Sequence, residues 1–116
     1  MLDDVTSVAL HSALSSLSLR QRVVANNIAN VETPNFHAGR VSFEDALRSA
    51  VQNGGDPAAV TAAVQESLEP TREDGNNVNL DHETLAAIDT NLRYQVSLRA
   101  LDSKFGLIGT VIKGGA

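Results

Sequence analysis

Apolar side chains in the first thirty residues recur at alternating steps of four and three, the pattern of a helix face that packs on another helix. No Gly or Pro interrupts about residues 3–30, and Thr33-Pro34 then ends the stretch, because proline disfavours helical backbone in the residue before it. The sequence therefore predicts one long helix with a coiled-coil seam. The seam residues are Leu10, Leu14, Leu17, Val24, Ile28 and Val31, with Gln21 at the remaining position.

A second long helix is predicted over about residues 81–113. Asp81 is the candidate N-cap, and Leu80 and Leu85 occupy the positions of a hydrophobic staple. The apolar residues fall in two rows that do not share one register, so the stripe is expected to shift within residues 92–96. The first row is Leu85, Ile88 and Leu92, and the second is Tyr94, Leu98, Leu101, Phe105, Ile108 and Ile112.

Residues 32–80 between these helices hold all three prolines and four of the eight glycines. The helical spacing of apolar residues over 43–51 predicts a short amphipathic helix, and Asp56-Pro57 predicts the start of a second one. Residues 66–83 carry six acids and one arginine, so this stretch holds the whole net charge of −5. Around Asp74-Gly75 we expect an exposed turn or flexible loop.

The expected fold is mainly α and forms one structural domain. An N-terminal core helix lies in residues 1–31, a short, partly ordered middle segment in 32–80, and a C-terminal core helix in 81–116. The two long helices are expected to pair as an antiparallel coiled-coil hairpin.

Composition and motifs exclude several classes of function. A net charge of −5 argues against a nucleic-acid binder, which needs a basic surface, and against a polybasic membrane-surface protein. The chain has no cysteine, and His82-Glu83 lacks a second histidine four residues on, where Ala86 stands, so no metal site is expected. No serine lies in a nucleophile elbow. We therefore expect no enzyme, no cofactor and no small-molecule substrate.

Three asparagines stand within five positions at the end of the first helix: Asn26, Asn27 and Asn30. Asparagine is unfavourable inside a helix, and Asn26 and Asn30 share one face beside the apolar seam. One interpretation is a fraying helix end at which these residues act as caps. The other is that side-chain amides at a packed interface fix register and partner choice.

The segment Ala-Asn-Asn-Ile-Ala-Asn-Val-Glu-Thr-Pro-Asn-Phe, residues 25–36, resembles the N-terminal signature of the rod and hook proteins of the bacterial flagellum. Two further segments resemble the proximal-rod members of that family: residues 74–83, Asp-Gly-Asn-Asn-Val-Asn-Leu-Asp-His-Glu, and residues 92–95, Leu-Arg-Tyr-Gln, leading to Ser103-Lys104-Phe105. The resemblance covers nearly the whole chain and is weakest over residues 54–70. Asn35 stands where glycine is common in the family, but both tolerate left-handed backbone, so we expect the bend to survive.

The resemblance implies a structural subunit of the flagellar basal-body proximal rod, the drive-shaft across the periplasm. Implied partners are other rod subunits, the adaptor between membrane ring and rod, the rod cap and the flagellar type III export apparatus. Family members leave the cell interior without a cleaved signal, and the acidic opening Met-Leu-Asp-Asp likewise predicts no secretory signal peptide. Phe43 and Leu47 are similar to the motif by which rod and hook subunits dock on the export gate, although such a pair is also common in simple helix packing.

A lone pair of helices would leave apolar rows exposed, and exposed apolar rows favour self-association. We therefore expect copies to stack head-to-tail through the terminal helices. The expected assembly residues are Leu10, Leu14, Leu17, Val24, Asn26, Asn27, Ile28, Asn30, Leu92, Tyr94, Leu98, Leu101, Phe105 and Ile108. The alternative is a soluble helical-hairpin adaptor or secretion chaperone, which would use the same heptads to hold a client. That alternative predicts a discrete dimer at all concentrations, whereas a rod subunit is expected to be monomeric or to form open polymers.

Overall fold

The structure, a computed structural model, describes the backbone of residues 4–114 and the side chains of residues 4–104. The first helix, α1, spans Val5–Ala29, which confirms the predicted long N-terminal helix. It starts at Asp4, whose carboxylate accepts a hydrogen bond from the backbone N–H of Ser7 at 2.8 Å, as an N-cap does. It ends at Asn30, whose side-chain amide donates to the carbonyl of Asn26 at 2.8 Å.

The last helix, α3, spans Leu80–Gly114 and has 35 residues, which confirms the second long helix. Its N-cap differs from the prediction: the side chain of Asn79, not Asp81, accepts a hydrogen bond from a first-turn backbone N–H, that of His82, at 3.1 Å. Leu80 and Leu85 are both exposed, so the predicted hydrophobic staple is wrong. Asn79 takes the place of Asp81 because the helix begins at Leu80, two residues earlier than a cap at Asp81 implies.

Between the long helices lie four short elements: β1 (Gly39–Ser42), α2 (Glu44–Gln52), the 3₁₀ turn η1 (Pro57–Ala59) and β2 (Ala63–Glu66). The predicted amphipathic helix is present as α2. The second predicted helix is only the single turn η1, although Asp56 does cap it, accepting from the Ala58 N–H at 3.0 Å.

The two strands pair as an antiparallel hairpin that the sequence did not predict. In its register Gly39 lies opposite Glu66 and Val41 lies opposite Val64. Each strand has four residues, and only Val41 among them is buried, so neither carries an alternation long enough to recognise. The middle of the chain is therefore α and β rather than loops with short helices alone.

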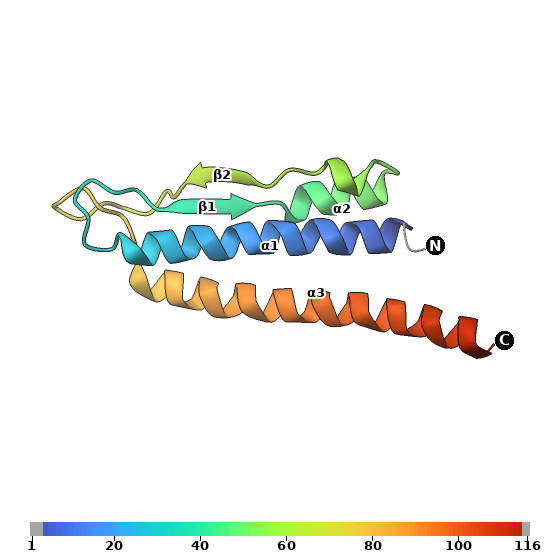
Figure 1. The fold of residues 1–116 in the computed structure, drawn as a ribbon. Helices are drawn as coiled ribbons and strands as arrows, with labels where there is room; N and C mark the ends of the chain where they lie inside the picture. The colour runs from blue at the N-terminus through green and yellow to red at the C-terminus, as the bar shows by residue number, and fades with distance from the viewer. Residues whose placement is uncertain (1–3, 115–116) are drawn as a thin grey trace.

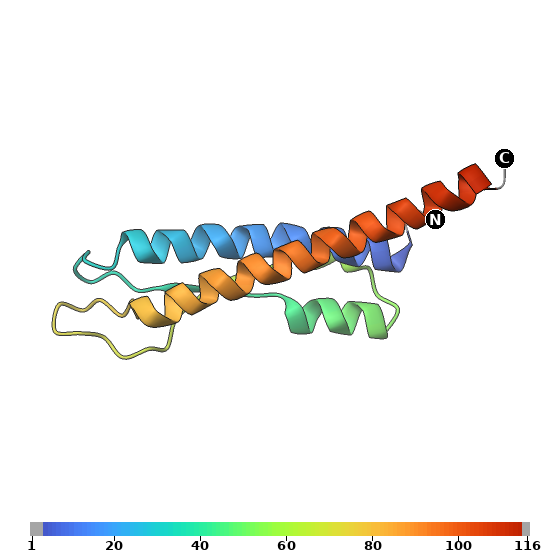
Figure 2. The same cartoon turned by 90° about the horizontal axis from the view of Figure 1, so that it is seen from below.

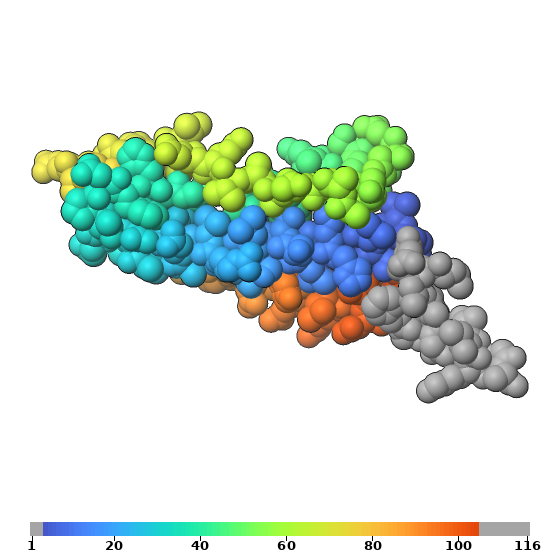
Figure 3. Space-filling model, turned by 45° about the horizontal axis from the view of Figure 1, so that its top comes forward, coloured from blue at the N-terminus to red at the C-terminus, as the bar shows by residue number. Residues whose placement is uncertain are grey.

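Helix α1 is the central layer of the molecule (Figures 1 and 2). The hairpin, α2 and η1 cover one of its sides, and α3 lies along another. The buried core sits between α1 and the hairpin layer, where Leu17, Val41 and Phe43 meet. The space-filling view shows α1 as a band that stays at the surface between the two outer layers (Figure 3).

Helices α1 and α3 lie side by side and run in opposite directions (Figure 1). At one end Lys104 forms an ion pair with Asp4, and at the other Asn27 is hydrogen-bonded to Glu83. The fold is thus mainly helical, with long N- and C-terminal helices and a small two-stranded sheet. None of the described helices has the length and apolar character needed to cross a membrane.

Candidate assembly surfaces

One face of α3 is covered by α1, and its residues keep a single register along the described side chains. The positions follow steps of four and three without a break, so the predicted shift within residues 92–96 is wrong. This register could not be recognised from the apolar residues of the sequence, because most of the covered positions carry polar or small side chains. These inner-face residues, each buried or half-buried, are Glu83, Ala87, Thr90, Tyr94, Ser97, Leu101 and Lys104.

The large apolar residues of α3 instead point outward. At 100° per residue, their positions lie on the side of the helix opposite the inner face. These residues, here called the outer ridge, are Leu85, Ile88, Leu92 and Val96, and they are between 58% and 67% exposed. Leu98, from the predicted second row, is also exposed, at 41%. The side chains of Phe105 and Ile108 lie outside the described residues.

The predicted seam of α1 is covered unevenly. Leu17 and Val24 are buried, and Leu10, Leu14 and Ile28 are half-buried. Leu17 belongs to the core formed with the hairpin layer, so the seam packs on two elements, not on α3 alone.

Asn27 joins all three layers. Its amide nitrogen donates to the carbonyl of Gly39 at 2.9 Å and to Glu83 Oε2 at 3.1 Å, and its amide oxygen accepts from the Gly39 N–H at 3.0 Å. Only 1% of the residue is exposed. Within the chain, Asn27 thus fixes the register of α1, β1 and α3. Asn26 is exposed and Asn30 is half-buried.

Two further buried asparagines, Asn76 and Asn77, hold the acidic segment in place. The Asn76 amide donates to the carbonyls of Asn30 and Thr33, both at 2.8 Å, and so caps the end of α1. The Asn77 amide oxygen accepts from the backbone N–H of Ala38 at 2.7 Å. The predicted turn is therefore tied down at these two residues, whereas residues 70–74 before it are exposed. The pair Asn-Asn after Asp-Gly suggested a turn, and nothing in it indicated burial.

The expected bend at Asn35 is present. Asn35 has φ +63°, in the left-handed region, and its backbone N–H donates to the carbonyl of Asp74 at 2.9 Å. The bend brings the two signature segments, residues 25–36 and 74–83, against each other, although they lie about forty positions apart in the sequence.

Arg20 anchors the start of α2 on α1. Its guanidinium binds both oxygens of Glu44, at 2.6 and 2.7 Å, donates to the carbonyl of Val41 at 2.7 Å, and lies 5.0 Å from the centre of the Phe43 ring. Hydrogen bonding from Arg20 holds the pKa of Glu44 below its ordinary value. Arg93 of α3 approaches the same carboxylate at 3.4 Å. This cluster keeps Phe43 buried and Leu47 half-buried in the folded chain.

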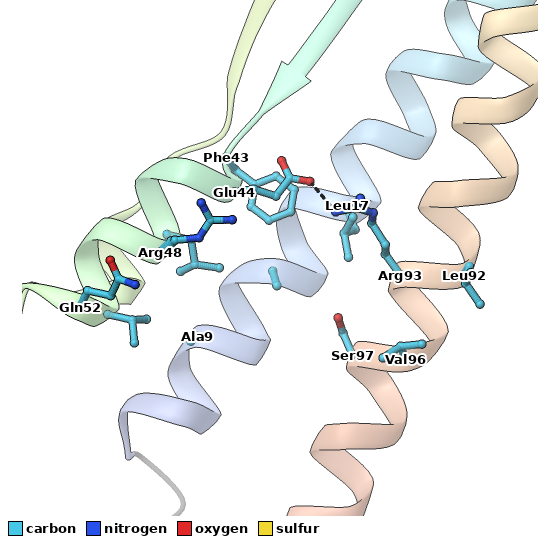
Figure 4. A pocket seen from close by; sticks show the side chains of 13 residues that line it. Ala9, Leu17, Phe43, Glu44, Arg48, Gln52, Leu92, Arg93, Val96 and Ser97 are labelled. Atoms are coloured by element: carbon cyan, nitrogen blue, oxygen red, sulfur yellow. Dashed lines mark hydrogen bonds and ion pairs between the residues drawn. The ribbon is translucent and has the colours of Figure 1, made fainter.

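An open groove of about 620 Å³ lies between α2 and α3, with α1 as its floor (Figure 4). Ala9, Ala13 and Leu17 form the floor. Leu47 and Val51 line the α2 wall, and Val96 and Ser97 line the α3 wall. In Figure 4, Leu92 points away from α2, toward the outer side of α3.

His11 lies in α1, His37 in the segment before β1 and His82 in α3, and all three are exposed. Within the part of the chain that the structure describes, no three His, Cys, Asp or Glu side chains gather as a metal site would require.

Known proteins are similar to this sequence over most of its length. Residues 9–37, which include Asn26, Asn27 and Asn30, match the family described as flagella basal body rod protein. The flagellar basal body rod protein FlgB of Escherichia coli (strain K12) is 32% identical over 123 residues, which cover 89% of each chain. FlgB of Bacillus subtilis is 30% identical over 118 residues (91% of this chain, 92% of that protein), and FlgB of Borrelia hermsii is 32% identical over 124 residues (89% and 92%). This chain belongs to the FlgB family of flagellar basal body rod proteins.

Proposed function

We propose that this chain is a structural subunit of the proximal rod, which polymerises through its terminal helices into the drive-shaft that transmits torque across the periplasm. Membership of the FlgB family supports a structural role in the flagellar basal body rod. In this proposal the partners are other rod subunits, the membrane-ring adaptor, the rod cap and further copies of the chain. The chain reaches them through the flagellar type III export apparatus without a cleaved signal.

The outer ridge of α3 is the observation that carries this proposal. Four large aliphatic side chains, each more than half exposed, form one stripe on the far side of α3 from α1. Water contact with such a stripe is unfavourable by roughly 25 cal/mol for each Å² of apolar surface, so a partner that covers the stripe gains that energy. Neighbouring subunits of a rod supply such a cover.

The inner face supports the pairing of α1 and α3 as an antiparallel coiled coil inside each subunit. Its steps of four and three are those of a heptad repeat. In the proposed rod this pair is one building block, and the outer ridge, with the exposed positions Asn26 and Leu98, faces neighbouring subunits.

The export motif has a separate role in this proposal. Phe43 is 4% exposed and packs on Leu17, so an export gate that binds Phe43 and Leu47 has to meet the chain before it folds. Folding would then hide the motif after export.

Replacing Ile88 by Glu tests the polymerisation step. Ile88 is exposed, so the variant is expected to fold and to be exported, yet a carboxylate in the ridge should prevent rod formation and motility in cells that lack the native gene. The matched control is Asn91→Glu, which adds the same charge at an exposed α3 position away from the ridge. Basal bodies are examined by electron microscopy, and export is measured by immunoblot. Normal rods with Ile88→Glu would refute assembly through the ridge, and a discrete dimer of the purified chain at every concentration would favour a chaperone.

A further inference from the structure

The direction of the backbone groups along each edge of the hairpin follows from one hydrogen bond. Ser67 donates its backbone N–H to the carbonyl of Ala38 at 2.8 Å, and the two residues lie opposite each other when the strand register is continued by one residue. Along antiparallel strands, hydrogen-bonded pairs alternate with pairs that are not hydrogen-bonded. In the next pair, Gly39 and Glu66, the N–H and C=O groups therefore point outward, and the same holds two residues further along each strand.

The outer edge of β1 is closed by side chains of α1. The Asn27 amide donates to the outward carbonyl of Gly39 and accepts from its outward N–H, and Arg20 donates to the outward carbonyl of Val41. These bonds agree with the alternation along the strands. Since α1 occupies this side of the hairpin, no further strand can be added to β1.

The outer edge of β2 is open. The N–H and C=O groups of Val64 and Glu66 point to this side, and no described group beyond the strands forms a hydrogen bond with them. Natural proteins often protect such an edge with proline, lysine or a bulge. Residues 60–68 contain no proline, lysine or arginine, and the register runs without a bulge. Val64 and Leu68 are 55% and 94% exposed, so this edge is free to pair with another extended chain.

A groove of about 530 Å³ lies beside the open edge, between α1 and residues 58–62, which lead into β2. Figure 3 shows β2 lying along the exposed surface of α1. The α1 wall of the groove runs from Val8 to Arg22, fourteen helical steps or about 21 Å, which is the length of about six extended residues. Ser12 and Ser15 in this wall are small, and they leave room for the side chains of an added strand.

The charge of the groove favours an acidic strand. The residues that line it include Arg22 and no carboxylate, although the chain has a net charge of −5. Arg22 is exposed and forms no ion pair with the side chains that the structure describes. Leu19 and Val60, both half-buried, add apolar surface to the same groove. A strand that carries an acid beside Arg22 and small or apolar residues elsewhere therefore matches the lining.

We propose that β2 pairs with an extended, acidic segment of a different protein of the basal body, which adds a third strand to the sheet and fills the groove beside α1. The inference rests on the proposed function and specifies the chemistry of one partner. A second copy of the chain fits the assembly less well as the occupant. Pairing of two β2 edges would close a dimer and use up the open edge of both copies, whereas the proposed rod has to extend.

Hydrogen exchange tests the pairing without any substitution. In the purified chain the amides of Val64 and Glu66 are expected to exchange rapidly, because their N–H groups point away from β1. In isolated basal bodies we expect exchange at these amides to be at least ten-fold slower, because the added strand accepts their hydrogen bonds. The rates are measured by mass spectrometry on peptides that cover residues 62–68.

A proline substitution tests whether an outward N–H is needed. Val64→Pro removes one outward N–H and no hydrogen bond of the hairpin, and Val64→Ala is the matched control that keeps this N–H. Both variants are produced in cells that lack the native gene, and urea unfolding shows whether each one folds. We expect Val64→Ala to enter basal bodies normally and Val64→Pro to enter at least ten-fold less, as measured by immunoblot. Glu66→Pro repeats the test at the second outward N–H, and if neither proline variant folds, the exchange rates decide.

The partner is identified by cross-linking from the exposed residue Gln65. The chain has no cysteine, so Gln65→Cys can carry a single benzophenone maleimide in basal bodies. We expect a cross-link to an acidic segment of a different protein, and at least ten-fold less of it when Val64→Pro is added.

Three results would overturn the inference. Exchange over residues 62–68 that is equally fast in the purified chain and in basal bodies would mean that the edge stays open. A folded Val64→Pro chain that enters basal bodies as well as Val64→Ala would mean that no strand needs this N–H. A cross-linked product that contains two copies of the chain would mean that β2 pairs with β2. The proposed function fails by a different result, namely normal rods in cells that lack the chain.

Discussion

Replacing Asn27 by Ala should show how much one amide contributes to joining the three layers. The side chain makes two hydrogen bonds with Gly39 and one with Glu83, at 2.9 to 3.1 Å, and the residue is 1% exposed. A buried polar group that loses its partner costs about 1–3 kcal/mol. The substitution strands three such groups: the N–H and C=O of Gly39 and one oxygen of Glu83. Because the three losses arise at one site and do not add fully, we expect the free energy of unfolding to fall by about 3–5 kcal/mol.

Urea unfolding followed by circular dichroism measures this loss. Asn26→Ala is the matched control, because Asn26 is the exposed neighbour in the same helix and gives the same change in helix propensity. The control is expected to change the free energy of unfolding by less than about 0.5 kcal/mol. Combining Asn27→Ala with Glu83→Ala should give a coupling energy of about 1 kcal/mol, since the two side chains share one hydrogen bond. If Asn27→Ala costs no more than Asn26→Ala, the amide is not what holds the layers in register.

Three other substitutions test separate features. Gly75→Ala should lower the free energy of unfolding by about 1–2 kcal/mol in urea melts, because Gly75 has φ +82° and an added Cβ would collide with Asn35 Oδ1; an unchanged melt would contradict the turn geometry. Thr90→Val should raise it by about 1 kcal/mol, since the buried hydroxyl of Thr90 has no hydrogen-bond partner among the described residues; a loss would mean that the hydroxyl is bonded. Arg20 lowers the pKa of Glu44, so the stability that this carboxylate adds is present above its unfolded-state pKa and disappears as the pH falls through the lower folded-state pKa. Glu44→Gln should therefore lose less stability than the unchanged chain when thermal melts are followed into acid, and equal losses would contradict a role for this pair.

The parts of the fold that depend on neighbours in the sequence could be predicted. The steps of four and three in residues 10–31 were enough to predict α1, because a helix that packs along its length repeats its covered positions locally. The left-handed turn at Asn35 followed from the family resemblance, which implies a bend at this position, together with the readiness of asparagine to adopt positive φ.

The parts that depend on distant partners could not be predicted. Strands β1 and β2 are four residues each, and their pairing joins residues more than twenty positions apart. The burial of Asn76 and Asn77 depends on carbonyls and N–H groups in residues 30–38, to which no local pattern points. A buried asparagine and an asparagine in an exposed turn look the same in the sequence, and only the long-range hydrogen bonds distinguish them.

Helix α3 shows why the candidate surface was predicted only in part. A sequence pattern assigns leucine and isoleucine to the covered side of a helix, yet Leu85, Ile88 and Leu92 are exposed and Thr90 is fully buried. The covered face carries the small side chains Ala87, Thr90 and Ser97 among larger ones, and the large aliphatic side chains lie on the opposite face. The two apolar rows of α3 looked out of register in the sequence because their residues belong to two different faces of the helix. A helix that carries its larger apolar face away from its own chain leaves that face exposed in the single chain, and this asymmetry agrees with the proposed role as a subunit whose second interface is supplied by assembly.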